Sequence, residues 1–156
     1  MTQGYWRTGL AGVLAGIVFS LLSILTFYVL GDLTGILNNP AVQSPKVIAV
    51  LQTLEPLPVM VRAPFIIFTG WIVIFVGYAF LFDHFSVLWP SNYWARLWRL
   101  TLIVWFFSWL FFEFMGPFNL LAEPLPLLAL ELVFWAICTL GASAVMVAMI
   151  GQRHTD

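Results

Sequence analysis

The chain has 156 residues, of which 62% are hydrophobic and 8% are charged, and its formal net charge at pH 7 is -1. Soluble domains carry roughly 45–50% apolar and about 25% charged residues, so a soluble fold and a disordered chain are both excluded. The charge balance argues against nucleic acid as a partner. The single cysteine, Cys138, excludes a disulfide scaffold. These properties indicate an integral membrane protein.

Four stretches are long and apolar enough to cross a bilayer, which takes about 20 residues. In chain order they cover about residues 8–31, 63–82, 97–115 and 125–150. Apolar and polar residues do not alternate along them as they would in a β-barrel. The sequence therefore predicts one all-α membrane domain over residues 1–156, built as a four-transmembrane-helix bundle.

The long segment between the first two spans is predicted to contain a short helix over about residues 45–55. Ser44 would be its N-cap and Pro45 its first residue. An apolar face follows at helical spacing, formed by Val47, Val50, Leu51 and Leu54. Such a helix either lies in the outer membrane interface or packs on the bundle, and the pattern leaves both open.

The distribution of positive charge predicts the orientation. Arg7, Arg96, Arg99 and Arg153 lie on the side of the termini, against Lys46 and Arg62 on the other side. This asymmetry favours cytoplasmic N- and C-termini, and the short loops favour a bacterial inner membrane. Arg96 and Arg99 are expected to meet anionic lipid headgroups.

The two halves of the chain share an order of short motifs. Tyr5-Trp6-Arg7 precedes the first span, and Tyr93-Trp94-Ala95-Arg96 precedes the third. A Glu-Pro-Leu-Pro motif precedes the second span at residues 55–58 and the fourth at residues 123–126. His84 and His154 follow those two spans. The order predicts two helical hairpins of the same direction, although chance matches are an open alternative.

Small residues line parts of the first and fourth spans. Gly12, Gly16 and Ser20 form a ladder at four-residue spacing, and Cys138, Gly141 and Ala142 belong to the fourth span. Small residues allow the close van der Waals contact that associates helices in lipid. They could pack within the bundle or between subunits.

An acidic site is predicted at the outer end. Glu131 lies inside the fourth span, on the order of 8–10 Å from its start, where a charge must be paired, protonated or hydrated. Glu113 and Arg62 are expected at similar height, with Asn119 and Glu123 in the turn between the last two spans. In the structural interpretation Arg62 pairs with Glu131 or Glu113. In the functional one, Glu131 and Glu113 exchange protons with a substrate and Arg62 holds an anionic group.

The third span carries an aromatic stripe. Five side chains share one helical face: Trp94, Trp98, Trp105, Trp109 and Phe112. Such a face suits a flat lipophilic ligand such as a quinone, a carotenoid or a sterol-like molecule, but it could also meet lipid or a partner helix. The candidate ligand-binding residues are Trp98, Trp105, Trp109 and Phe112, together with Asn119 and Glu123 of the turn.

No motif for nucleotide binding, nucleophilic catalysis or redox chemistry is present, and we expect neither a cofactor nor a metal site. The favoured function is a non-catalytic membrane subunit that scaffolds a larger complex or binds a lipophilic ligand. Its partners would be lipids, other membrane subunits or a second copy of the chain. Two alternatives remain: a small enzyme of isomerase or cyclase type that uses carboxylate acid–base chemistry on a lipophilic substrate, and a proton-coupled homo-oligomeric carrier.

Overall fold

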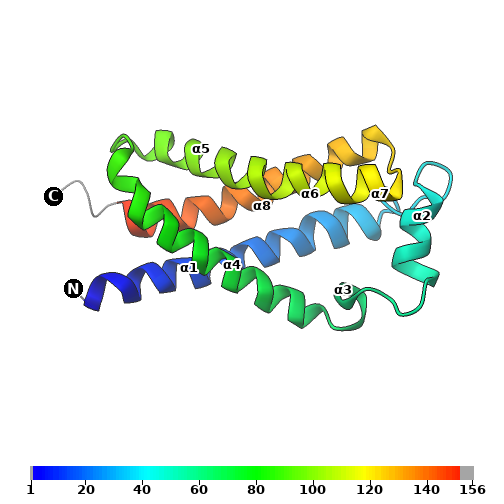
Figure 1. Cartoon of the computed structure of the whole chain (residues 1–156), viewed down its shortest axis with the longest axis horizontal. Coiled ribbons are helices and arrows are strands. Elements are labelled where there is room, and N and C mark those ends of the chain that lie inside the picture. Colours follow the sequence, from blue (N-terminus) through cyan, green and yellow to red (C-terminus); the bar gives the residue numbers. More distant parts are fainter. Residues whose placement is uncertain (1, 152–156) are drawn as a thin grey trace.

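The computed structural model describes residues 2–151, and every regular element in that range is a helix. Figure 1 shows an elongated bundle, with the segment between the first two spans folded over one end and α1 starting at the opposite end. Four helices are long and apolar enough to cross a membrane. The all-α class and the four long apolar helices predicted from the sequence are therefore confirmed.

The first, second and fourth long helices lie close to their predicted positions. They are α1 (Thr2–Ser23), which a π-helical segment extends to Asp32, α4 (Pro64–Phe85) and α8 (Leu125–Ile150). Pro64 and Pro126 stand in the first turns of α4 and α8, where a missing backbone N–H costs nothing. The prolines that bounded these stretches in the sequence thus open the helices.

The third long helix is longer than predicted, and it reaches from Tyr93 to Leu121 instead of 97–115. Its consecutive parts are α5 (Tyr93–Val104), a π-helical segment (Trp105–Leu110), α6 (Phe111–Glu113), a second π-helical segment (Phe114–Phe118) and α7 (Asn119–Leu121). Asn92 caps the start by accepting a hydrogen bond from the Ala95 amide at 3.1 Å. At the other end the helix passes through Pro117, because a wider π turn accommodates a residue that lacks an N–H.

Helix α1 is central, since it packs along both α4 and α8, and α8 also packs against α5. Gly12 and Gly16 bring α1 close to α4: a Cβ atom at Gly12 would lie 2.5 Å from the Val76 Cα atom, and one at Gly16 2.6 Å from that of Ile72. Gly141 of α8 faces the Leu22 side chain of α1, a contact with a side chain and not with backbone. The small-residue ladder therefore packs within the bundle.

The interior of the bundle holds a stack of aromatic rings. The Trp109 and Trp135 rings are parallel within 7° and their centroids are 4.0 Å apart. Phe19 of α1 stacks on both, at 5.2 and 5.8 Å. Trp71 of α4 meets Phe19 edge to face. Because these rings come from all four long helices, they fix how the helices sit against one another.

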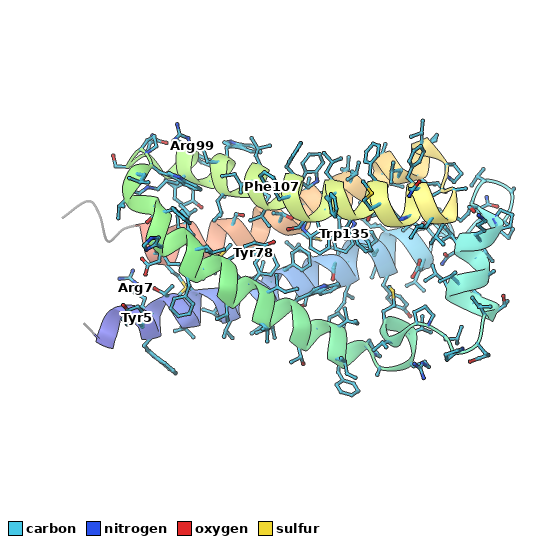
Figure 2. All side chains as sticks on the ribbon, viewed as in Figure 1. Tyr5, Arg7, Tyr78, Arg99, Phe107 and Trp135 are labelled. Carbon is cyan, nitrogen blue, oxygen red and sulfur yellow. The ribbon has the colours of Figure 1, made fainter. Side chains whose placement is uncertain are left out.

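Positive residues lie at both ends of the bundle. Arg7 and Arg99 lie at the same end (Figure 2), and Arg99 is exposed. Arg96 differs from its prediction, because its side chain is only 2% exposed. It donates hydrogen bonds to the carbonyl of Pro90, at 2.7 Å, and to that of Gly151 at the end of α8. Arg96 therefore satisfies helix-end carbonyls instead of meeting lipid headgroups. Arg153 lies outside the described residues.

The predicted loop helix begins where expected. Ser44 accepts a hydrogen bond from the Lys46 amide at 3.2 Å, α2 covers Pro45–Ile48, and a π-helical segment continues over Ala49–Thr53. Val47 is buried, whereas Leu54 is exposed and lies beyond the helical part. A further short helix, α3 (Val59–Arg62), precedes α4.

The packing gives the predicted repeat no support. A two-fold axis relating the hairpins would carry the extensive α1–α8 contact onto an equal contact between α5 and α4. Among residues 2–151 these two helices share no comparable interface. The two-hairpin repeat stays a prediction, and His154, one of the residues that suggested it, lies outside the described range.

Candidate functional site

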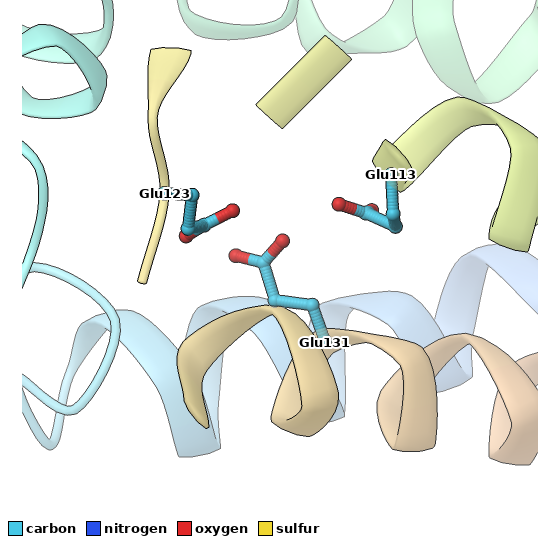
Figure 3. Close-up of side chains that lie close together, drawn as sticks. All are labelled: Glu113, Glu123 and Glu131. Atoms are coloured by element: carbon cyan, nitrogen blue, oxygen red, sulfur yellow. The ribbon is translucent and has the colours of Figure 1, made fainter. Parts of the chain in front are cut away.

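Three glutamates meet at the end of the bundle that the first loop covers. Glu113 comes from α6, Glu123 from the turn between α7 and α8, and Glu131 from the second turn of α8. Figure 3 shows their carboxyl groups pointing toward one another. Each offers one oxygen, and the three oxygens lie within 4.8 Å of one another. The structure thus brings together three of the residues singled out in the sequence.

Glu113 is only 1% exposed, and its two carboxyl oxygens have different surroundings. Oε1 accepts a hydrogen bond from the Trp135 indole N–H at 2.5 Å. Oε2 is buried and has no hydrogen-bond partner. Since buried polar atoms in folded proteins are nearly always paired, this oxygen needs an explanation.

Glu123 is held by the first loop. Its Oε1 atom accepts a hydrogen bond from the Gln43 side-chain amide at 2.6 Å, and the neighbouring Ser44 hydroxyl donates to the Leu121 carbonyl at 2.5 Å. Glu123 is 3% exposed. Burial raises the pKa of its carboxyl, and the Gln43 hydrogen bond lowers that pKa by a smaller amount. The loop is therefore fastened to the turn that carries the carboxylate.

A cavity of about 610 Å³ opens beside the three carboxyl groups. Its wall comes from the end of the first span, the first loop, α2, α3, the third span and α8. Most of that wall is apolar, as with Phe27, Leu37, Val50, Leu51, Phe112 and Leu120. It contains four carboxyl groups, those of Asp32, Glu113, Glu123 and Glu131, whereas no described lysine, arginine or histidine lines it.

Two predicted site residues lie elsewhere. Arg62 is exposed, and its Nε atom donates to the Leu57 carbonyl at 2.6 Å, so the predicted pairing with Glu131 or Glu113 is wrong. The short helix α3 places the Arg62 side chain within reach of the Leu57 carbonyl, five residues earlier in the same loop. Asn119 is exposed and does not line the cavity.

The aromatic stripe of the third span is divided. Trp105 and Trp109 pack against the core, and Trp105 donates to the Leu132 carbonyl at 2.9 Å. Trp98 is 53% exposed and Phe112 is 52% exposed, although Phe112 also lines the cavity. The π-helical segment at Trp105–Leu110 changes the number of residues per turn, so side chains before and after it no longer share one face.

Sequence reasoning missed two residues of this site, Gln43 and Trp135. Trp135 could have been found, because it follows Glu131 by four residues and so shares its helix face. Gln43 carried no such signal, since it reaches Glu123 across 80 residues of sequence.

The site concentrates negative charge at the edge of an apolar cavity. Carboxylates this close cannot all be ionised without compensation, so the balancing positive charge comes from protons or from a bound cation. Comparisons with protein-family models, curated proteins and solved structures found no match to the chain.

Proposed function

We propose that the chain is a membrane protein that binds a lipophilic small molecule in the cavity between its first loop and the ends of its long helices. The observation that carries the proposal is the cavity itself. Its volume of about 610 Å³ falls in the range of about 300–1,000 Å³ that is typical of small-molecule sites. An apolar wall with a few polar groups at one edge suits an amphiphilic ligand.

The cavity is placed well for a ligand that arrives from the bilayer. The surrounding surface carries many exposed apolar side chains, among them Phe112, Leu120 and Met60. The apolar body of the ligand would occupy the wall formed by α2 and the third span, and its polar end would face the glutamates. In this proposal the membrane is a bacterial inner membrane and the termini are cytoplasmic, so the cavity lies at the outer leaflet.

Native mass spectrometry of the protein in nanodiscs, with extraction of lipids and small molecules, tests the proposal. A Gly116→Leu variant should lose the bound molecule. Gly116 lines the cavity, and a Cβ atom there would meet only the Phe112 ring, at 3.9 Å, so a larger side chain can start from this position and occupy part of the cavity.

Gly77→Leu is the matched control, because Gly77 lies on α4 away from the cavity and a Cβ atom there meets nothing within 4 Å. This variant should retain the ligand. A wild-type protein that carries no molecule after gentle extraction, and binds none from a lipid extract, would refute the proposal.

A second candidate function is an acid–base enzyme acting on a lipophilic substrate, which the unpartnered Oε2 atom of Glu113 favours. A carboxyl oxygen free of protein partners beside a cavity is available to a substrate proton. Under this candidate Glu113→Gln would bind the ligand as tightly as the wild type but convert it at least about a hundredfold more slowly, the contribution typical of one such group. Equal rates in the two proteins would exclude it.

A scaffolding role and a proton-coupled carrier have less support. The small-residue faces that could have bound another subunit are used within the bundle. A carrier needs a polar route between the two membrane faces, and the core beyond Glu131 is the aromatic stack of Phe19, Trp109 and Trp135.

A further inference from the structure

Glu113 places an unsatisfied oxygen at the centre of the acidic cluster. The side chain is 99% buried, one of its oxygens is held by Trp135, and Oε2 accepts no hydrogen bond from an N–H or hydroxyl donor in the described residues. A buried oxygen without a donor destabilises the fold. Glu123 and Glu131 each present a further carboxyl oxygen within 4.8 Å, and these are acceptors when ionised. The missing partner of Oε2 is therefore either a proton shared with a neighbouring carboxyl group or a bound cation.

No basic side chain in the described part of the chain lies at the cluster to balance its negative charge. The cavity wall contains no lysine, arginine or histidine, and Arg62 is engaged by the Leu57 carbonyl. The donors that do reach the cluster are neutral: the Trp135 indole on Glu113 and the Gln43 amide on Glu123. They orient two carboxyl groups and leave the third, that of Glu131, directed at the others (Figure 3).

The spacing of the oxygens matches one bound ion. In a Ca²⁺ site, oxygens on opposite sides of the ion lie about 4.6–5.2 Å apart, and adjacent ones about 3.3–3.7 Å. Three oxygens within 4.8 Å of one another are close enough to contact one such ion. Mg²⁺ holds its ligands at about 2.0–2.1 Å, so its opposite oxygens are only about 4.2 Å apart. Mg²⁺ also demands near-ideal octahedral geometry, whereas Ca²⁺ accepts flexible geometry, so Ca²⁺ is the less demanding occupant of this cluster.

We propose that Glu113, Glu123 and Glu131 form a divalent-cation site of the Ca²⁺ type at the edge of the cavity. An all-carboxylate donor set without histidine or cysteine favours a hard cation. A divalent ion bound by three carboxylates leaves one net negative charge, which the N–H groups of Trp135 and Gln43 partly offset. Further coordination positions would be filled by water or by a polar group of a molecule in the adjoining cavity.

The cation site is independent of the proposed lipophilic ligand. Its test uses the metal alone, on chelator-treated protein in detergent without added ligand. Gly116→Leu occupies part of the cavity and changes none of the three glutamates, and a Cβ atom at this position would meet only the Phe112 ring. If that variant loses lipophile binding and still binds the cation, the lipophile site and the cation site are shown to be separate.

Tb³⁺ serves as the first probe, because it replaces Ca²⁺ at oxygen sites and emits when a nearby tryptophan is excited. Trp135 is hydrogen-bonded to Glu113 and is placed to sensitise it. We expect saturable emission that Ca²⁺ displaces at a concentration at least about tenfold lower than Mg²⁺ does. Isothermal titration with CaCl₂ should give one ion per chain.

Glu131→Gln and Glu113→Gln should each weaken Ca²⁺ binding at least about tenfold, since losing even an outer partner of a metal ligand costs that much. The control is Glu55→Gln, an exposed glutamate of the first loop outside the cluster, which should bind like the wild type. Ca²⁺ should also raise the unfolding temperature of the wild type, a readout that needs no variant to fold. Absence of saturable Ca²⁺ and Tb³⁺ binding to the wild type, or equal loss in Glu55→Gln, would overturn the proposal.

Discussion

Gly12 and Gly16 decide how closely the first two spans approach, because neither has a Cβ atom to hold the helices apart. Neither position needs an unusual backbone angle, but a Cβ atom at either one would strike the backbone of α4. The polar residues of the interior, by contrast, depend on the hydrogen-bond partners that they meet there. Arg96 and Glu113 are buried at opposite ends of the bundle, where Arg96 donates hydrogen bonds to two carbonyls and Glu113 accepts one from Trp135.

Gly12→Ala should destabilise the protein by about 1–3 kcal/mol, the usual cost of overpacking. Its methyl group would sit 2.5 Å from the Val76 Cα atom, so α1 and α4 would have to separate. Gly9→Ala is the control: nothing lies within 4 Å of its Cβ position, and alanine should stabilise the helix by about 0.5–1 kcal/mol. Unfolding in mixed detergent measures the stability of both variants. Equal stability of Gly12→Ala and Gly9→Ala would contradict the close contact between α1 and α4.

Arg96→Met should destabilise the protein by about 3 kcal/mol, because two carbonyls lose hydrogen bonds from a charged donor. The methionine keeps most of the apolar stem. Arg99→Met, at an exposed position three residues later, should change stability by less than about 0.5 kcal/mol. Thermal unfolding in detergent compares them, and a loss of similar size in both would show that Arg96 acts at the surface.

At the scale of elements, π-helical segments shape the third span. They let the helix run through Pro117 and rotate Trp105 and Trp109 toward the core while Trp98 stays exposed. The first loop is the other decisive element. It covers the cavity with α2 and holds the turn before α8 through Gln43 and Ser44.

Ser44→Ala should loosen this cover. The variant removes the N-cap of α2 and the hydrogen bond to the Leu121 carbonyl, at a cost of about 1–2 kcal/mol. Amide hydrogen exchange over residues 45–53 should become faster, while α1 and α8 stay protected. Thr53→Ala, which removes only an exposed hydroxyl bonded to Ala49, should leave this exchange unchanged. Unaltered exchange in Ser44→Ala would mean that the loop is held by its apolar contacts alone.

At the scale of the whole molecule, the bundle has two different ends. One carries the first loop, the cavity and the glutamates, and the other carries Arg7 and Arg99, together with Arg96, which is bonded to the end of α8. With four spans, the turn between α4 and α5 must lie on the side of the first residues of α1. The charge difference between the ends favours the arginine-bearing end as cytoplasmic.

Single-cysteine labelling tests this topology. Glu55→Cys and Ser91→Cys lie at exposed positions in the two connections, and the native Cys138 is fully buried and should stay silent. A membrane-impermeant maleimide should label Glu55→Cys in intact bacterial cells and Ser91→Cys only after the membrane is opened. Labelling of both in intact cells would contradict four spans, and the reverse pattern would invert the orientation.

The amino-acid sequence by itself determined the class of the protein, the four apolar helices, the start of α2 at Ser44-Pro45 and the acidic character of one end. Each depends on local composition or on residues a few positions apart. It also identified Glu113, Glu123 and Glu131 as candidates, because carboxyl groups are rare in so apolar a chain.

Only the tertiary structure decided which of these residues meet. The predicted partner Arg62 turns back to its own loop, and Gln43 and Trp135 reach the glutamates instead. The aromatic stripe divides where π turns change the helical phase, and Arg96 leaves the surface to bind Gly151. These outcomes depend on contacts between residues up to 80 positions apart, and on small changes of helix geometry, neither of which residue spacing records. Spacing along a helix gives the direction of a side chain, whereas its partner is set by how whole helices pack.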